Sequence, residues 1–245
     1  MHSVRRRGLG AATLVLAAAG LLAGCTSTQH AAKRMQLDSA RERAAQLSTR
    51  VTSANPLITA TRVATVSGGG ATAFVVTVHN GSRRAATDLP ISVGYSLPGG
   101  RRVYLNAGTT LNYFEAHLPA IFSGRSSVWV YTANAELPRG ARPFAFVGSK
   151  PAAPALLTET NVRIRLTWTE VRAGTVRIKL VNPTSVPQYQ LQVYAYAERS
   201  GHYTAAANAT VVDLGAGSKQ SLTLHLVGEP DGARLQIEAI PTILQ

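Results

Sequence analysis

The amino-acid sequence predicts an all-β fold built from two tandem β-sandwiches, and two observations predict it. From residue 57 onward, apolar and polar residues alternate in short runs separated by turn-forming glycine, proline and asparagine, the pattern of half-buried strands. These runs then recur in the same order, 102 residues apart at Asn80 and Asn182 and 92 apart at Gly140 and Gly232. The 245 residues are enough for two such domains after an N-terminal leader.

The first 24 residues have the three parts of an export signal. Arg5, Arg6 and Arg7 provide the basic start, an apolar run from Leu9 to Leu22 follows, and small residues precede the cut site. The run has about 14 residues, fewer than the roughly 20 that a helix needs to cross a bilayer. Residues 1–24 are therefore expected to form a signal peptide that is removed.

The signal ends in Leu22-Ala23-Gly24-Cys25, which resembles the lipobox of bacterial lipoproteins at all four positions. The resemblance implies that the Cys25 thiol carries diacylglycerol, with palmitate-type acyl chains, and that Cys25 begins the mature chain. It also implies a location at the extracytoplasmic face of the cell membrane. The alternative is an ordinary secretory signal with a chance cysteine. Cys25 is the only cysteine in the sequence, so the mature chain can form no internal disulfide.

Residues 25–56 are predicted to be a tether between the anchor and the fold. They are rich in Ala, Arg, Ser, Thr and Gln, and Leu37, Ala40, Ala44 and Leu47 recur at helical spacing. Because alanine buries little surface, we expect a flexible or weakly helical tether, with any helix near residues 33–47.

The first sandwich is predicted at residues 57–150. Two alternating runs, Thr59 to Val66 and Phe74 to His79, flank a glycine-rich turn and predict a hairpin. Further strands are expected at Leu89 to Tyr95, at Val128 to Val130 and after Arg142, with a long connection from Gly99 to Pro119.

The second sandwich is predicted at residues 156–245, after a proline-containing linker at residues 151–155. Val162 to Trp168 and Val176 to Leu180 repeat the hairpin around a turn that ends at Gly174. Later strands are expected at Tyr189 to Ala195, at Leu222 to Leu226 and from Arg234 onward.

Each repeat has the length and strand texture of an immunoglobulin-like β-sandwich, without the Cys and Trp spacing of antibody domains. A strand that ends in Asn182, the strand from Leu191 to Val193 and the turn at Gly217 and Ser218 resemble the bacterial extracytoplasmic sandwiches of the FxLYD and CARDB kind. The resemblance implies adaptor or binding modules and no catalytic family.

No motif of catalytic or metal-binding residues stands out. The nearest approach to a hydrolase elbow is Gly94 to Pro98, which lacks the final glycine. The six histidines and twelve acidic residues are spread singly, without the local spacing of metal ligands. We therefore expect no enzyme activity, no catalytic residue, no metal site and no cofactor.

The chain is strongly basic. Its net charge of +13 falls to +10 when residues 1–24, with three arginines and no acid, are removed. Export argues against nucleic acid as the partner, and the arginines follow no nucleic-acid fold motif. The expected partners are the membrane, through the lipid on Cys25, and an envelope protein or an anionic envelope polymer. A solvated surface without a functional contact is the alternative explanation of the charge.

Aromatic residues supply the candidate ligand-binding set. Rigid rings give contact area at small entropic cost, and arginine beside them favours sugar rings or a protein partner. The alternative is that half of each alternating set belongs to the core. The candidates are Tyr104 and Tyr113 in the long connection, Arg101 and Arg102 beside them, and Tyr194 and Tyr196 in the second repeat.

These observations lead to two hypotheses about function. The first is a non-catalytic binding or scaffold module of the cell envelope, anchored to the membrane. The second is a substrate-capture or accessory subunit of a transporter or cell-wall-modifying enzyme, with its ligand between the domains. A cleft near the linker with aromatic and polar groups favours the second, whereas two closed sandwiches with an apolar surface patch favour the first.

Overall fold

The computed structural model describes residues 31–41, 50–51, 53–107, 112–149 and 163–242, and it confirms the all-β fold. The described strands form antiparallel sheets. The chain divides into two compact units, residues 1–43 and 44–245, and each is described by itself. The predicted lipidation residue Cys25 and the predicted linker at 151–155 lie outside the described residues.

The described part of the first unit is a helix at 31–41. Arg34 and Asp38 form an ion pair across one turn of this helix, with 3.6 Å between Nε and Oδ2. The helix overlaps the segment where a weak helix was expected, although it begins two residues earlier. Among the described residues, no helix combines the length and apolar character needed to cross a membrane.

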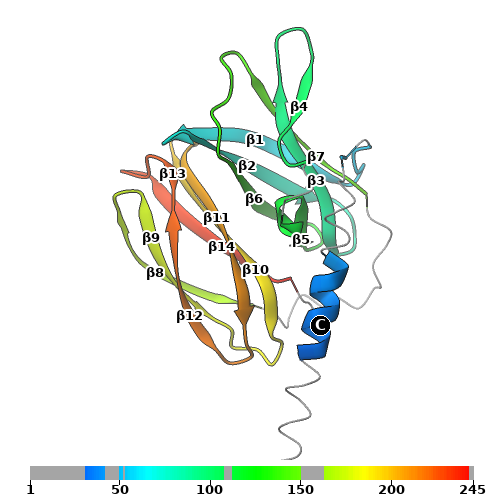
Figure 1. The fold of residues 1–245 in the computed structure, drawn as a ribbon, viewed down its shortest axis with the longest axis vertical. Coiled ribbons are helices and arrows are strands. Elements are labelled where there is room, and N and C mark those ends of the chain that lie inside the picture. Colours follow the sequence, from blue (N-terminus) through cyan, green and yellow to red (C-terminus); the bar gives the residue numbers. More distant parts are fainter. Residues whose placement is uncertain (1–30, 42–49, 52, 108–111, 150–162, 243–245) are drawn as a thin grey trace, which may run out of the picture. The chain divides into compact units, whose positions relative to one another are not determined.

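The first half of the larger unit contains two sheets, drawn from cyan to green in Figure 1. One sheet has the order β1-β2-β6. In the other, β3 is the central strand and pairs with β4, β5 and β7. The strands are β1 (Ile58–Gly68), β2 (Ala71–Asn80), β3 (Ala86–Ser96), β4 (Arg102–Tyr104), β5 (His117–Ile121), β6 (Ser126–Ala133) and β7 (Arg142–Val147), with a short 3-10 helix, η1 (Tyr113–Glu115), before β5.

The second half repeats this pairing. Its first sheet has the order β12-β9-β8, which matches β6-β2-β1, and in its second sheet β10 pairs with β11 and β14 as β3 pairs with β5 and β7. The added partners are β4 in the first half and β13 in the second. The strands are β8 (Arg165–Arg172), β9 (Thr175–Val181), β10 (Gln188–Arg199), β11 (His202–Leu214), β12 (Lys219–His225), β13 (Val227–Gly228) and β14 (Arg234–Ile240).

A buried asparagine closes the corresponding turn in each half. Asn80 and Asn182 are fully buried. The Asn80 amide donates to the carbonyls of Arg84 (2.8 Å) and Ile121 (3.2 Å), while its Oδ1 accepts from the N–H (2.9 Å) and Oγ (2.6 Å) of Ser82. Asn182 makes the same set of bonds, to Val186, Leu214 and Thr184. All four hydrogen-bonding positions of the Asn80 amide are therefore satisfied without water.

A second matched feature lies in the central strands β3 and β10. Asp88 and Gln190, again 102 residues apart, have positive φ angles of 50° and 55°. The register of the ladder is the same on both sides of each residue, with Thr87↔Ala120 and Leu89↔Leu118 around Asp88 and Tyr189↔Asp213 and Leu191↔Val211 around Gln190. The same left-handed backbone conformation thus occurs at the same place in the central strand of both halves.

The two halves pack directly on each other, side by side in Figure 1. Alternating residues of β2 point to opposite faces, and both faces are buried. Phe74 and Val76 face the β3 sheet, whereas Ala73 and Val75 face the second half. Tyr194 and Tyr196 of β10 belong to the same apolar cluster as β2, so the cluster crosses between halves. The four sheets are therefore stacked, with the β1-β2-β6 and β13-β11-β10-β14 sheets in the middle.

Polar contacts tie these two middle sheets together. The Arg62 guanidinium lies 4.0 Å from the centroid of the Tyr203 ring, and its Nη1 lies 3.0 Å from Glu198 Oε1. Nη2 of Arg62 donates to the carbonyl of Gly201. Thr132 Oγ1 donates to the side-chain oxygen of Asn208 at 2.8 Å. The second half is thus fixed in orientation against the first.

The chain before β1 also belongs to the larger unit. Val51 is buried, and its N–H donates to the hydroxyl of Ser92 on β3 at 2.9 Å. Ala54 forms a β-bridge with Gly148, just after β7. Packing against the first half therefore begins a few residues before residue 57, where the sequence analysis placed the start of the sandwich.

Candidate functional site

The structure brings together only part of the candidate ligand-binding set. Tyr104 and Arg102 lie on β4 in one surface cluster, and the exposed Arg101 precedes them. Tyr113, in η1, stacks on His117 with 3.9 Å between ring centroids. Tyr194 and Tyr196 are buried between the halves, with 1% and 5% of their surface exposed. These last two are consequently part of the molecule's interior and offer no open contact surface.

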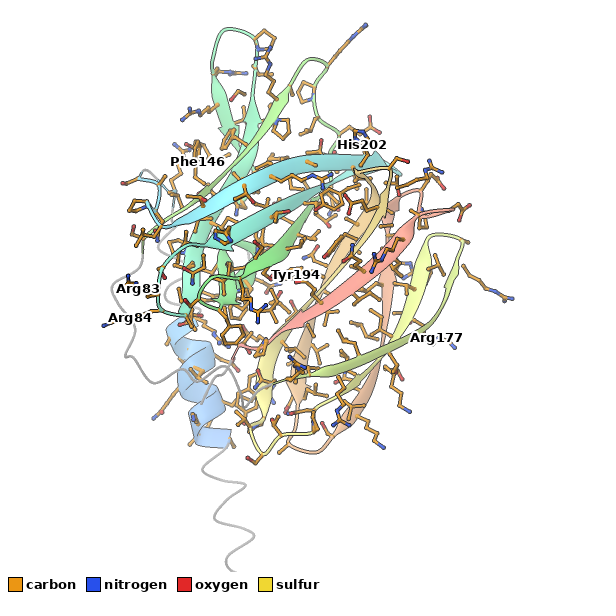
Figure 2. The ribbon with its side chains drawn as sticks, turned by 180° about the vertical axis from the view of Figure 1, so that it is seen from behind. Arg83, Arg84, Phe146, Arg177, Tyr194 and His202 are labelled. Atoms are coloured by element: carbon orange, nitrogen blue, oxygen red, sulfur yellow. The ribbon has the colours of Figure 1, made fainter. Side chains whose placement is uncertain are left out.

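The surface cluster lies on the face of the β3 sheet that points away from the second half. Tyr104 and Phe144 lie on either side of Gly94, and Phe146 pairs with Ser92 on the same face. The partners of Ile91 and Val93, by contrast, point into the core. Figure 2 shows Phe146 on this outer side of the first half. We call Tyr104, Phe144, Phe146, Arg50 and Arg102 the outer aromatic cluster.

Guanidinium groups cover the rings of this cluster. Arg102 lies 5.1 Å from the centroid of Phe146 and 5.8 Å from that of Phe144, and Arg50 lies 5.1 Å from that of Tyr104. The rings of Tyr104 and Phe144 meet edge to face at 5.1 Å. Such cation–π contacts orient the arginines but leave their charge and most of their donors available.

Glycine at position 94 allows the two rings to meet. A Cβ on Gly94 would lie 2.9 Å from the ring of Phe144 and would overlap the carbonyl of Val103. The missing side chain leaves the gap across which Tyr104 and Phe144 make contact, as aromatic residues beside a strand glycine often do.

The end of the molecule next to the cluster is basic. The turn before β4 and the turn before β7 lie side by side, since a Cβ on Gly140 would be 3.8 Å from Pro98. Exposed arginines of these turns and strand starts are Arg101, Arg102, Arg139 and Arg142, and the exposed acid in the same two segments is Glu136. This excess of positive charge favours an anionic partner.

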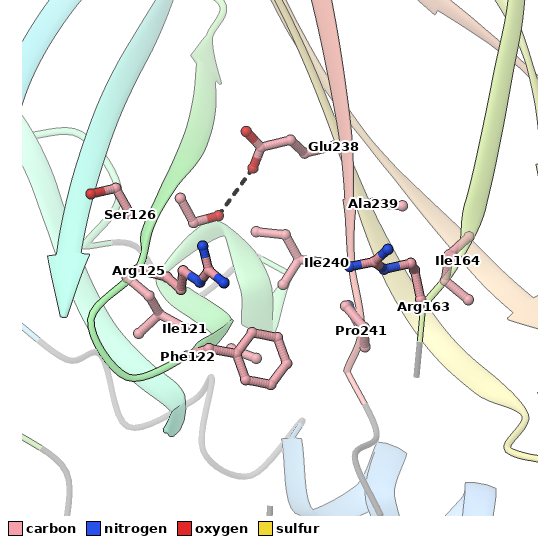
Figure 3. A pocket seen from close by; sticks show the side chains of 12 residues that line it. Ile121, Phe122, Arg125, Ser126, Arg163, Ile164, Glu238, Ala239, Ile240 and Pro241 are labelled. Atoms are coloured by element: carbon pink, nitrogen blue, oxygen red, sulfur yellow. Dashed lines mark hydrogen bonds between the residues drawn. The ribbon is translucent and has the colours of Figure 1, made fainter. Parts of the chain in front are cut away.

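A pocket of about 500 Å³ opens between the halves (Figure 3). It lies where the loop from β5 to β6 faces the end of β14 and the residues just before β8. We call it the interface pocket. Its polar side chains are Arg125, Ser126, Ser127, Arg163 and Glu238. The apolar lining residues are Ala120, Ile121, Phe122, Ile164, Ala239, Ile240 and Pro241.

Glu238 connects this pocket with the buried tyrosines. The hydroxyl of Tyr196 donates to Glu238 Oε1 at 2.9 Å, and Ser127 Oγ donates to Oε2 at 3.1 Å. Burial, together with the negative charge of Glu238, raises the pKa of both Tyr194 and Tyr196 well above the usual value of 10.0. Both tyrosines are therefore neutral at ordinary pH, and they act as structural groups.

Among the described residues, no group of three or more His, Asp, Glu or Cys side chains converges as a metal site would require. Two of the described histidines make local contacts: His79 Nδ1 lies 3.1 Å from Ser126 Oγ, and His117 Nδ1 lies 2.8 Å from the carbonyl of Tyr113.

The sequence analysis missed the residues that complete both sites. Phe144 and Phe146 alternate in the last strand of the first half, and their alternation with Ala145 and Val147 was a usable signal for a two-faced strand. No local signal links Arg125 with Arg163 or Glu238, because these three are brought together only by the packing of the halves.

The fold and the two sites define a class: a β-sandwich protein with a basic aromatic surface and a pocket between repeated halves. No protein-family model matches the chain, and no curated protein matches its sequence.

Proposed function

We propose that this chain is a non-catalytic binding protein of the bacterial cell envelope, held at the extracytoplasmic face of the cell membrane by diacylglycerol on Cys25. In this proposal its two repeated halves are immunoglobulin-like modules, and the partner is an anionic polysaccharide of the envelope. The repeated topology and the lipobox Leu22-Ala23-Gly24-Cys25 support it.

The outer aromatic cluster is the observation that carries the choice of partner. Aromatic rings stack on sugar rings, and guanidinium groups pair with carboxylate or phosphate through two parallel hydrogen bonds. Arg102 lies over two rings, and Arg102 and Arg142 flank Ser96 in the sheet, so both kinds of contact are available on one face. A neutral glycan would use only the rings.

A binding titration tests this role. The mature chain, with Cys25→Ser to omit the lipid, is titrated with alginate, a polyuronate, and with dextran as the neutral control. We expect salt-sensitive binding of alginate, and about a tenfold loss when Arg102→Ala and Arg142→Ala are combined.

The matched control removes the same charge elsewhere. Arg177 and Lys179 are exposed on β9, in the other half, and Arg177 points into solvent in Figure 2. The double variant Arg177→Ala with Lys179→Ala should bind alginate almost as the parent does. Equal losses in both double variants would mean that alginate binding depends only on net charge. Equal binding of dextran and alginate would mean that the arginines do not contribute to binding.

The anchor is tested separately in cells. Cys25→Ser should release the protein from membranes or leave an unprocessed precursor, because the thiol is the only site for the lipid. Unchanged membrane fractionation, together with no lipid label on the parent chain, would contradict the anchor.

The interface pocket favours a second candidate function, capture of a small ligand by an accessory subunit. It opens between the halves, next to residue 163, where the described chain resumes after the linker segment. Its lining combines an aromatic ring with charged and hydroxyl groups, as the capture hypothesis requires.

A further inference from the structure

We propose that the interface pocket binds an anionic amphiphile, a molecule with a carboxylate or phosphate head and an apolar body. Two guanidinium groups would bind the head, and the apolar residues where the two cores meet would contact the body. The proposal deepens the second candidate function, and it is separate from the outer aromatic cluster.

Two arginines of the pocket have no acidic partner among the described residues. Elsewhere in the described chain, Arg34 pairs with Asp38 and Arg62 pairs with Glu198. Arg125 and Arg163 have no carboxylate within 4 Å in that part of the chain. Figure 3 shows them on the two sides of the pocket, with Ile240 between them. Two guanidinium forks beside one cavity favour an anion with several oxygen acceptors.

Glu238, the acid of the pocket, is already engaged. Its Oε1 accepts from Tyr196, and its Oε2 accepts from Ser127 Oγ and, at 3.4 Å, from the N–H of Val128. These donors hold the carboxylate against β6 and β10. An anionic head would be repelled from Glu238 and attracted by the arginines, so the charge distribution sets the direction in which a ligand enters.

The apolar lining comes from both cores. Ile121 and Ile240 belong to the cluster of the first half and its interface, and Ile164 belongs to the cluster of the second half. These three are at most 7% exposed, so they form a floor, and Phe122 and Pro241 extend it. The cavity of about 500 Å³ lies within the range of small-molecule sites, about 300–1,000 Å³.

Charge and apolar area together define the ligand class. A small inorganic anion would leave the apolar lining exposed to water, and an uncharged hydrocarbon would leave both guanidinium groups without an anionic partner. An anionic amphiphile satisfies both parts. A fatty-acid carboxylate and a lipid phosphate share this chemistry, and the choice between them is left to the probes.

Calorimetric titration with three probes of equal chain length tests the proposal. The mature chain carrying Cys25→Ser, so that its own lipid does not compete, is titrated with octanoate, octyl phosphate and 1-octanol below their aggregation limits. We expect one binding event per chain for at least one anion, and about tenfold weaker binding of octanol. Preference for octanoate would indicate a fatty acid, and preference for octyl phosphate would indicate a phosphate lipid.

Variants then assign the event to the pocket. Arg125→Ala and Arg163→Ala should each weaken the anion about fivefold or more while leaving octanol unchanged. Arg177→Ala, which removes the same charge from an exposed position of β9 that does not line the pocket, should have no effect. Ala239→Leu should weaken both anion and octanol by filling the cavity.

Several results would overturn the proposal. Equal affinity for octanol and both anions would remove the role of the arginines, and full binding by the Arg125 and Arg163 variants would place the event elsewhere. No heat from any probe would also contradict it. None of these results affects alginate binding at the outer aromatic cluster, and loss of alginate binding leaves the octanoate titration unchanged, so the two proposals fail independently.

Discussion

Two tyrosines on one face of β10 differ in whether their hydroxyl has a hydrogen-bond acceptor. Tyr196 donates its hydroxyl proton to Glu238, whereas the hydroxyl of Tyr194, in the same buried interface, has no hydrogen-bond partner among the described residues. A buried hydroxyl without a partner costs about 1–3 kcal/mol of desolvation that no bond recovers. The two side chains are of one type and two residues apart, so each serves as the control for the other.

We predict opposite effects for removing these hydroxyls. Tyr194→Phe should leave the free energy of unfolding unchanged or raise it by up to about 1 kcal/mol, while Tyr196→Phe should lower it by about 1.5–3 kcal/mol because it breaks a bond to a charged group. Urea denaturation of the two variants and the parent measures this. Equal losses in both would mean that Tyr194 has a partner of comparable strength.

Stability should also fall in alkaline solution. Burial raises the pKa of Tyr131, Tyr194 and Tyr196 above the usual 10.0. Below about pH 10, folded and unfolded chains both hold these protons, so these groups give the free energy of unfolding no pH dependence. Above it the unfolded chain releases protons that the folded chain keeps, which favours unfolding. Urea midpoints measured from about pH 8 to 11 should decline above pH 10, and a flat profile would contradict the burial of these phenols.

The buried asparagines should matter far more than exposed ones. Asn182→Ala leaves the carbonyls of Val186 and Leu214 and the hydroxyl of Thr184 without their bonds, so we expect a loss of about 2–4 kcal/mol in the free energy of unfolding. Asn134→Ala, in an exposed loop, is the control and should cost less than about 0.5 kcal/mol. Thermal unfolding of both variants gives the comparison.

At the scale of elements, the two starting hairpins differ at one position of their turns. The β1–β2 turn uses Gly69 and Gly70, and the β8–β9 turn uses Ala173 and Gly174, all with positive φ. Two-residue hairpin turns of this kind favour glycine at both positions. Ala173, at φ 46°, therefore holds a side chain in the left-handed region.

The turns can be exchanged as a test. Ala173→Gly should raise the free energy of unfolding by on the order of 1 kcal/mol, because relief of strain exceeds the added chain entropy. Gly69→Ala should lower it by a similar amount, although a Cβ there would meet no atom within 4 Å. Denaturant titration of each variant measures the change, and a loss on Ala173→Gly would show that the turn carries no strain.

Most strands could be predicted from the sequence, and the reason is local. Alternation and turn residues located β1, β2, β3, β6, β9, β10 and β12 within a few residues. The short β4 and the start of the proline-containing β5 fall in the segment predicted to be a connection, because neither strand has enough alternating residues to produce a signal. The outer aromatic cluster was only half predicted, since Tyr104 and Phe144 meet across Gly94 from strands about 40 residues apart.

At the scale of the whole molecule, a sequence signal for the packing of the halves was present but was not used. Leu191 to Ala197 and Ala73 to Val78 are nearly continuous apolar runs, and strands buried on both faces read in this way. Alternation identifies two faces but does not say what covers the second one. In the structure, the second face of the β2 sheet packs against the second face of the β10 sheet. This contact also creates the interface pocket between β6 and β14.

This shared interface should make the larger unit unfold as one. Ala206 on β11 is fully buried in the cluster that joins the halves, and Val212 on the same strand is 59% exposed. We expect one cooperative denaturant transition for the parent. Ala206→Glu should lower the free energy of unfolding by at least about 3 kcal/mol, since it buries an unpaired charge, and Val212→Glu should change it by less than about 0.5 kcal/mol. Fluorescence and far-ultraviolet circular dichroism recorded together measure these transitions. Two separate transitions in the parent, or equal effects of the two variants, would mean that the halves are stable without their common interface and that the pocket between them is free to open.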